Sequence, residues 1–285
     1  MPSEYVRPDL VALDVRPPIL PTMADTAVTF DDGAAYERFM GRWSRAVGTI
    51  FLDWLAPPAG ARWLDLGCGT GVLTGLILDI SSPAAVAAID PSTAQIEYAR
   101  RQPVAERADF RVADAQALPF PDHSFDAIVS ALAINFIPDR PRALLEMRRV
   151  GQPGGIVAGY VWDFAAARSS SWPLAQGLRR IGIEPPLVPG TKDSTLDALH
   201  SLFVQTGLED IAVRSIEVTV TFPDFDTYWR SQTPPFSPHG KAIAGLSAID
   251  RVKLMGAVRT SLPADPNGGI AYSARANAIK SRVQA

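Results

Sequence analysis

The stretch Trp63-Leu64-Asp65-Leu66-Gly67-Cys68-Gly69-Thr70-Gly71 decides how this chain folds. It reads as a short apolar strand that ends on an acidic residue, then three glycines at alternate positions, then a helix that begins near Val72. Glycines at this spacing let two backbones approach closely, and they leave room for a ligand against the turn and the next helix N-terminus. Many nucleotide-binding folds use one such turn, so the acidic strand ends that follow it are needed to make the signal specific.

Apolar strands and helical patterns alternate downstream of this turn. The expected strands cover 62–66, 85–89, 110–113, 125–130 and 156–161, and the expected helices cover 72–79, 92–101 and 140–150. Apolar strands that alternate with helices are typical of a parallel sheet covered on both faces. Asp65, Asp90 and Asp114 fall at or next to the carboxyl ends of three strands, where such sheets bind ligands. The sequence therefore predicts three acids on one rim of the sheet.

The regions outside this alternating core have looser patterns. A helical pattern runs over 36–55, and further helices are expected over 164–181, 196–206 and 249–262. Residues 211–222 alternate apolar and polar side chains as a strand does, with a bulge expected near Ser215, and 270–279 forms the last strand. These two strands predict an antiparallel pair at the sheet edge, interrupted by an insert over residues 223–266.

The composition excludes several classes of partner. The 285 residues are 47% hydrophobic and 20% charged, and the formal net charge of −3 predicts no basic surface for nucleic acid. No apolar run reaches the roughly 18–20 residues that a membrane helix needs. The single cysteine, Cys68, allows no internal disulfide and suits a reducing compartment. We therefore expect a cytoplasmic protein with neither a nucleic-acid nor a membrane partner.

Five segments in order resemble the class I S-adenosylmethionine-dependent methyltransferases, and most closely the small-molecule branch that includes ubiquinone-biosynthesis-like enzymes. The segments are Leu64–Gly71, Ile89–Ser92, Ala113–Ala115, Ser124–Ser130 and Gly151–Gly155, and the resemblance covers about residues 36–163. It implies a Rossmann-like α/β fold: a seven-stranded, mostly parallel sheet with helices on both faces and an antiparallel last strand. It also implies a methyltransferase that uses S-adenosylmethionine, releases S-adenosylhomocysteine, and methylates an O, N or C atom of a small, partly apolar molecule.

The resemblance also implies how the chain is organised. Residues 1–30 are expected to form a flexible tail, because their many prolines show no sustained apolar periodicity. Residues 31–285 then form a single methyltransferase domain. Within it, residues 35–55 act as an N-terminal lid helix and residues 223–266 act as a cap insert.

The resemblance assigns roles to the acidic strand ends. Asp65 is expected to hold the amino-acid end of the cofactor, directly or through water. Asp90 is expected to accept both ribose hydroxyls, a task that suits a carboxylate with two oxygens. Asp114 is expected to accept from the adenine amino group while the Ala115 backbone N–H donates to the ring. Asp126, although it lies in a family motif, is expected to be structural.

The same resemblance places the glycines and the lid helix at the cofactor. Gly67, Gly69 and Gly71 pack against the methionine and ribose portions, where a Cβ would clash. Arg42 meets the methionine carboxylate, and a carbonyl near Ala131 receives the ammonium group. The full set that the resemblance implies for the cofactor is Tyr36, Arg42, Asp65, Gly67, Cys68, Gly69, Gly71, Asp90, Pro91, Gln95, Asp114, Ala115 and Ala131.

The acceptor site is less determined by the sequence. The expected acceptor residues, which lie after strands four and five and in the insert, are Asn135, Phe136, Trp162, Tyr228, Trp229 and His239. The aromatic residues of the insert can equally well anchor it to the sheet. No residue stands out as a general base, and His239, Asp163 and Tyr160 are the candidates. The three histidines lack ligand spacing, so no metal site is predicted.

Three other functions share parts of this sequence pattern. An NAD-binding dehydrogenase needs Gly-x-Gly-x-x-Gly, but Val72 stands at the sixth position here. A nucleic-acid methyltransferase typically carries Asn/Asp-Pro-Pro-aromatic after strand four, which Asn135-Phe136-Ile137-Pro138 does not match. A methyltransferase-like protein that binds S-adenosylmethionine or S-adenosylhomocysteine without methyl transfer needs the same cofactor site, so this alternative stays open.

Overall fold

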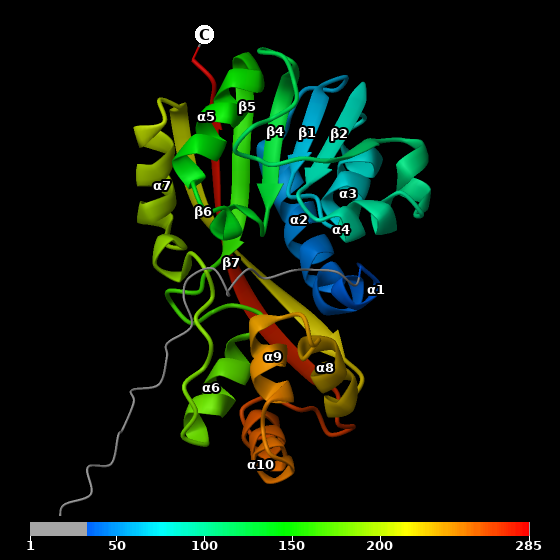
Figure 1. Ribbon diagram of the computed structural model, residues 1–285, viewed down its shortest axis with the longest axis vertical. Helices are drawn as coiled ribbons and strands as arrows, with labels where there is room; N and C mark the ends of the chain where they lie inside the picture. Colours follow the sequence, from blue (N-terminus) through cyan, green and yellow to red (C-terminus); the bar gives the residue numbers. More distant parts are fainter. Residues whose placement is uncertain (1–32, 285) are drawn as a thin grey trace, which may run out of the picture.

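In the computed structural model, residues 33–284 are described and form a seven-stranded sheet in the order β3-β2-β1-β4-β5-β7-β6 (Figure 1). The tail predicted for residues 1–30 lies outside the described residues. The strands are β1 (Arg62–Leu66), β2 (Ala85–Asp90), β3 (Asp109–Val112), β4 (Phe125–Ala131), β5 (Gly151–Trp162), β6 (Glu209–Phe222) and β7 (Ile270–Arg282).

Helices connect nearly all of these strands. In chain order they are α1 (Gly33–Tyr36), the π-helical η2 (Glu37–Gly41), α2 (Arg42–Leu55), α3 (Val72–Ile80), α4 (Thr93–Ala99), η3 (Pro103–Glu106), η4 (Ile134–Phe136), α5 (Arg140–Val150), α6 (Trp172–Arg180), η5 (Thr191–Asp193), α7 (Leu196–Gln205), α8 (Phe225–Gln232), α9 (Pro238–Ala244) and α10 (Ala248–Arg259).

The strand directions confirm the predicted fold class. Strands β1 to β5 pair in parallel with one another, and β7 runs antiparallel to both β5 and β6. The last strand in sequence is therefore the antiparallel one, and β6 forms the edge of the sheet beside it. No helix among residues 33–284 has the length and apolarity to span a bilayer.

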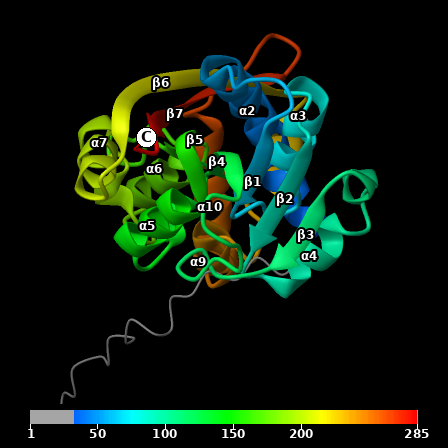
Figure 2. The ribbon, with the colours of Figure 1, turned by 90° about the horizontal axis from the view of Figure 1, so that it is seen from above.

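Two apolar layers hold the helices against the sheet. Trp63 packs with residues of α2 and α3, whereas its neighbour Leu64 packs with residues of α5 and α7. Successive side chains of a strand point to opposite faces, so an apolar strand can fill both layers. Figure 2 shows α2 and α3 on one side of the strands and α5 and α7 on the other.

The antiparallel pair extends beyond the rest of the sheet. The pairing of β5 with β7 ends at Trp162 and Ala276, but β6 and β7 stay paired as far as Phe222 and Ile270. Helices α6, α8, α9 and α10 gather around this two-stranded extension (Figure 1). The extension thus places the insert beyond the carboxyl ends of the parallel strands, where the ligand site was predicted.

Four sequence predictions about elements need correction. The helix predicted over 164–181 begins only at Trp172, because Asp163 holds the preceding residues in turns through its carboxylate and carbonyl. The bulge predicted near Ser215 lies between Glu209 and Ala212 instead. Strand β5 already begins at Gly151 rather than at residue 156. Helices α8 and α9 of the insert were not predicted, since each has only seven or eight residues and shows too little periodicity to identify.

Candidate functional site

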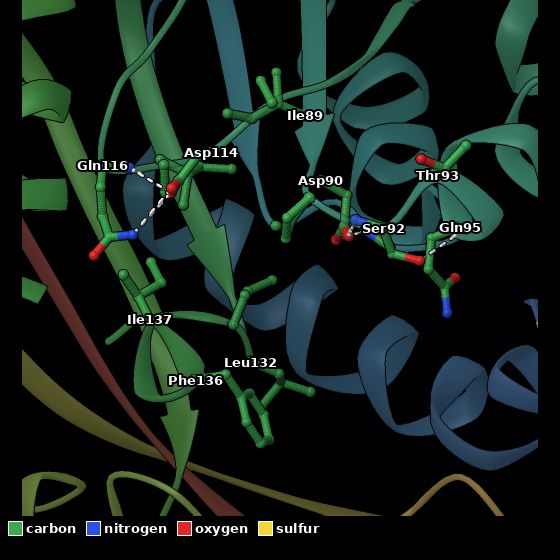
Figure 3. Close-up of a pocket in the computed structure, with 18 of the residues that line it drawn as sticks. Ile89, Asp90, Ser92, Thr93, Gln95, Asp114, Gln116, Leu132, Phe136 and Ile137 are labelled. Carbon is green, nitrogen blue, oxygen red and sulfur yellow. Dashed lines mark hydrogen bonds between the residues drawn. The ribbon is translucent and has the colours of Figure 1, made fainter. Parts of the chain in front are cut away.

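A cavity of about 770 Å³ lies at the carboxyl ends of the parallel strands. The turn after β1, the end of β2, the loop after β3 and residues 131–138 after β4 form its walls (Figure 3). Open parallel sheets bind their ligands at this edge, beside the point where the strand order reverses. Here the reversal falls between β1 and β4, because β2 and β3 lie on one side of β1 and the later strands on the other.

The glycine turn forms the floor of this cavity. Gly67, Gly69 and Gly71 have φ angles of +73°, +53° and +86°, a region that other residues adopt only at a cost. A Cβ on Gly67 would lie 2.3 Å from the Cβ of Ala133, so no side chain fits between the turn and the loop after β4. The sequence therefore needs glycine here both for the backbone angle and for the close approach.

Asp90 fastens this turn from the end of β2. One carboxylate oxygen accepts from the Gly69 N–H at 3.0 Å, and the other accepts from the Ser92 N–H at 2.9 Å. Burial raises the pKa of Asp90, and the two N–H donors oppose that shift. Each oxygen keeps a second lone pair, so the carboxylate can still accept from the two hydroxyls of a bound ribose.

Asp114 lines the same cavity from the loop after β3. Its Oδ1 accepts from the backbone N–H of Gln116 at 2.9 Å, and the Gln116 side-chain amide lies 3.1 Å from both oxygens. The Gln116 carbonyl oxygen in turn accepts from the Asp139 N–H at 3.0 Å. Figure 3 shows Asp114 and Gln116 in contact beside the cavity. The sequence analysis missed Gln116, although its position two residues after an acidic strand end suggested an Asx turn.

Asp65 does not line this cavity, which corrects the prediction of three acids on one rim. Its side chain is fully buried, and its Oδ2 accepts from the Thr74 hydroxyl of α3 at 2.7 Å. Asp65 and Trp63 share one face of β1 because side chains alternate along a strand, and that face packs on α2 and α3. Oδ1 has no hydrogen-bond partner among residues 33–284, and burial raises the pKa of Asp65 to about 7.

Arg42 is also placed away from the cavity. Its guanidinium donates to the Thr221 carbonyl at 3.1 Å and lies 5.8 Å from the ring centre of Phe222. The prediction that Arg42 meets a cofactor carboxylate is therefore not realised in this structure, because the side chain extends toward β6. Its helical neighbour Tyr36 does line the cavity, since it points toward the glycine turn: a Cβ on Gly69 would lie 3.5 Å from its ring.

The remaining predicted cofactor residues divide between those that line the cavity and those that do not. Those that line it are Tyr36, Gly67, Gly69, Asp90, Pro91, Gln95, Asp114, Ala115 and Ala131. Cys68 is buried in a small apolar cluster and burial raises the pKa of its thiol, which suits packing rather than reactivity. Gly71 starts α3. Lining residues that the sequence analysis did not place there include Leu132, Ala133, Ile137 and Pro138, whose apolar pattern gave no signal.

A second, smaller cavity of about 60 Å³ adjoins the first. Tyr36, Leu132 and Phe136 line both cavities, so these side chains form the boundary between them. Of the predicted acceptor residues, the second cavity brings together Asn135, Phe136, Trp162 and His239. These residues come from the loop after β4, from β5 and from α9.

Tyr228 and Trp229 of α8 line neither cavity, which corrects their prediction as acceptor residues. The Tyr228 ring is fully buried and meets the Phe222 ring edge-on, with 5.2 Å between centres. Trp229 stacks on Phe225 with 6.0 Å between ring centres. Tyr228 thus anchors the insert to the extension of β6, which is the alternative that the sequence had left open, whereas the Trp229 contact lies within α8.

Two of the candidate bases are unsuitable in this structure. Tyr160 is fully buried, and burial raises its pKa well above the ordinary value. Asp163 is paired with Arg275, whose nitrogens lie 2.6 and 2.9 Å from one carboxylate oxygen. His239 alone of the three lines a cavity. No group of His, Cys, Asp and Glu within residues 33–284 has an arrangement that could hold a metal ion.

Comparisons with known proteins find similar sequences among methyltransferases. Residues 64–159 match the family described as a methyltransferase domain. The chain is 34% identical over 140 residues to the ubiquinone/menaquinone biosynthesis C-methyltransferase of Dinoroseobacter shibae, covering 48% of this chain and 55% of that protein. It is 38% identical over 133 residues to the malonyl-[acyl-carrier protein] O-methyltransferase of Methylococcus capsulatus, covering 46% of each. The chain thus spans about half the length of these relatives.

Solved structures resemble the chain over a longer range. The YcgJ protein of Bacillus subtilis superposes with a TM-score of 0.53 at 19% identity, covering 84% of this chain and 98% of that one. Phosphoethanolamine N-methyltransferase 2 of Haemonchus contortus gives 0.55 at 19% identity, covering 89% and 57%. At such identities the likeness shows the fold alone. By its family match over residues 64–159 and by its fold, this part of the chain is similar to a methyltransferase domain.

Proposed function

We propose that this protein transfers a methyl group from S-adenosylmethionine to an O, N or C atom of a small, partly apolar molecule and releases S-adenosylhomocysteine. The observation that carries the proposal is the pair of adjoining cavities. The larger holds two carboxylates and the glycine turn, and the smaller is lined mainly by apolar and aromatic side chains. A nucleoside in the first and an acceptor in the second would meet at Tyr36, Leu132 and Phe136.

The residues of the larger cavity fit an adenosyl nucleoside. Asp90 would accept from the ribose hydroxyls, and Asp114 from an exocyclic amine on the base, with Ala115 N–H donating to the ring. Leu132 and Ile137 offer apolar surface to a flat base (Figure 3). A Cβ on Gly67 would clash with Ala133. The turn therefore carries no side chain at this position, and its backbone stays open to a ligand. We also assign Gln95 and Pro91 to the wall beside the ribose.

The chemistry asks little of the protein beyond alignment. When bound, the cofactor supplies a methyl group on a positively charged sulfur, which leaves as a neutral thioether. The side chains around the two cavities hold the reactants in line and exclude water, and orientation of this kind can contribute on the order of 7–11 kcal/mol. No acid or base among the described residues is obligatory for such a displacement.

The same proposal gives roles to two segments that are distant in sequence and meet near the cavities. Residues 35–55 serve as a lid helix and residues 223–266 as a cap, all within one domain over 31–285. The support is that Phe236 of the insert lies 6.3 Å from Tyr36 and 6.1 Å from Phe39, measured between ring centres. The net charge and the single cysteine favour a cytoplasmic location without a nucleic-acid partner.

Two measurements test the proposal. Calorimetry should detect binding of S-adenosylmethionine and S-adenosylhomocysteine by the purified chain, and failure of both to bind would reject it, as would retention of a nicotinamide nucleotide instead. Transfer of a labelled methyl group to some member of a small-molecule library should then separate methylation from binding alone. The named relatives give no support to the alternative of binding without transfer.

A further inference from the structure

His239 lies in the smaller cavity with an unused hydrogen-bonding group. It is the second residue of α9, and only 5% of its surface is exposed. Its Nε2 is buried and has no hydrogen-bond partner within the described residues 33–284. A buried polar atom without a partner costs stability, so it needs an explanation such as a group supplied by a ligand.

The turn that carries His239 is rigid. The Ser237 hydroxyl accepts from the Gly240 N–H at 2.9 Å and donates to the Pro234 carbonyl at 3.0 Å. A Cβ on Gly240 would lie 1.8 Å from the Pro234 oxygen, so the backbone is packed tightly on that side. The backbone that carries the imidazole is therefore held in one place, as the support of a group that contacts a ligand should be.

The surroundings of His239 favour an uncharged ligand. None of the described residues that line the smaller cavity is Asp, Glu, Lys or Arg. Apart from His239, its polar side-chain groups are hydroxyls, the Trp162 indole N–H and one amide. The indole N–H is an uncharged donor without a partner within the described residues, and the Asn135 amide already donates to the Pro189 carbonyl at 3.1 Å. An ammonium or carboxylate acceptor would lose its hydration here without meeting an opposite charge. An uncharged molecule with a hydroxyl group meets no such penalty.

We propose that His239 accepts the hydrogen bond, and then the proton, of a hydroxyl group on an uncharged methyl acceptor, so that this protein methylates oxygen. The inference rests on the proposed function and narrows its acceptor to one chemical class. In the step, the hydroxyl oxygen forms a bond to the methyl carbon while the carbon–sulfur bond breaks and leaves its electron pair on sulfur. The hydroxyl proton passes to Nε2, so the positive charge moves from sulfur to the imidazole and then leaves with the proton to solvent.

The ionisation of His239 is compatible with this role. Burial, together with the nearby charge of Arg179, lowers its pKa to about 4, so the ring is neutral at physiological pH. In the tautomer protonated on Nδ1, Nε2 has a free lone pair. A hydroxyl oxygen becomes strongly acidic only as its bond to carbon forms, and a weak base then suffices to take the proton.

A ring-sized acceptor requires some movement. Benzene occupies a cavity of about 150 Å³ in a protein core, whereas this cavity measures about 60 Å³. Phe39 and Met40, which line it, belong to the π-helical stretch η2. Such stretches interrupt regular helices, often at functional sites, and a methionine side chain adapts easily to new neighbours.

Matched probes on the protein loaded with S-adenosylhomocysteine test the inference. 4-Nitrophenol has the hydroxyl group, 4-nitroanisole has a methyl ether in its place, and 4-nitroaniline has an amine. Dissociation constants are measured by calorimetry below the pKa of the phenol, for the wild type, His239→Gln and His239→Phe. His200→Phe, on the exposed surface of α7, makes the same change elsewhere.

We expect the wild type and His200→Phe to bind the phenol about tenfold more tightly than the ether or the amine. His239→Phe should lose this preference, and His239→Gln, which still offers an acceptor oxygen, should keep part of it. Equal binding of the three probes by the wild type, binding of none of them, or an unchanged preference in His239→Phe would overturn the inference. Because S-adenosylhomocysteine binding is measured separately on each variant, these outcomes are distinguishable from failure of the proposed function.

Discussion

At the scale of single residues, Asp90 links the glycine turn to the start of α4 independently of any ligand. Its two oxygens accept from the backbone N–H groups of Gly69 and Ser92, which both line the cavity. The carboxylate is thus already oriented when a ligand arrives, and little further ordering is needed on binding. This preorganisation is what makes a single side chain matter for affinity.

We expect Asp90→Ala to weaken S-adenosylmethionine binding by roughly 1.5–3 kcal/mol, or about 10- to 150-fold, because charge-assisted hydrogen bonds to the ribose are lost. Asp90→Asn keeps one acceptor oxygen, so its affinity for S-adenosylmethionine should lie between those of Asp90→Ala and the wild type. Asp109→Ala, which removes an exposed carboxylate paired with Arg111, is the matched control. Calorimetry measures all four proteins, and wild-type affinity in Asp90→Ala would contradict the placement of the ribose.

Asp65 makes stability depend on pH in a known direction. Its pKa is about 7 in the folded chain, against an ordinary value of 3.8. Between these values the folded chain keeps a proton that the unfolded chain has released, so the free energy of unfolding falls as pH rises. The slope is at most about 1.4 kcal/mol per pH unit. His239, whose pKa is lowered to about 4, contributes the opposite slope between about 4 and its ordinary 6.5.

We expect Asp65→Asn to lose less stability than the wild type between pH 5 and pH 7, because the amide does not ionise and still offers an acceptor to Thr74. Urea unfolding at pH 5, 6 and 7 measures the difference, and the contribution of His239 cancels between the two proteins. Parallel pH profiles for the wild type and the variant would show that the folded-state pKa of Asp65 is not raised.

At the scale of elements, the glycine turn joins β1 to α3 and sets the distance between β1 and the loop after β4. The backbone N–H groups of Gly67 and Cys68 both donate to the Ile89 carbonyl, at 2.8 and 2.9 Å, which fixes the turn against β2. The approach of Ala133 from the other side fixes it against the loop. Strand, turn and helix therefore form one unit whose shape depends on the absence of a side chain.

The substitution Gly67→Ala separates this packing requirement from the backbone requirement. Gly60 has a similar φ of +77° but nothing within 4 Å of the Cβ position, so Gly60→Ala pays only for the backbone angle, about 1–2 kcal/mol. Gly67→Ala adds overpacking against Ala133, and we expect a further 1–3 kcal/mol. Denaturant unfolding measures both variants, and equal losses would mean that the turn and the loop yield without cost.

At the scale of the whole molecule, the smaller cavity is lined by segments that lie about two hundred residues apart in sequence. Tyr36 and Phe39, from the N-terminal helical segment, contact Phe236 of the insert. The Gln232 amide also lies 3.4 Å from the Phe39 carbonyl. The extended β6–β7 pair carries the insert to this position, where it meets Tyr36, a residue that lines both cavities.

We expect S-adenosylhomocysteine to slow hydrogen exchange of backbone amides in both η2 and α9, because Tyr36 lines the larger cavity and contacts the insert. The amides of α10, which lies on the far side of the insert against α6, should not respond (Figure 1). In Phe236→Ala, S-adenosylhomocysteine should no longer slow the exchange of α9 amides, but it should still slow the exchange of α4 amides. Mass spectrometry measures the exchange of each segment. Slower exchange confined to the parallel strands would contradict a link between the larger cavity and the insert.

The sequence by itself determined the fold class and two of the acids that line the larger cavity, because both follow from local patterns. Hydrophobic period and turn glycines act within a few residues, so β1 and α5 have the predicted bounds. Asp90 and Asp114 line the cavity because parallel strands end at one edge. These features need no knowledge of which distant segments meet.

Only the tertiary structure decided which side chains reach the cavities. Asp65 and Arg42 carry suitable groups, yet one packs on α3 and the other extends to β6. Among the insert residues, Tyr228 anchors the cap while His239 lines the cavity, although both are buried. The physical reason is that a strand or helix pattern fixes which face a residue occupies, whereas the neighbour on that face is set by the packing of segments distant in sequence.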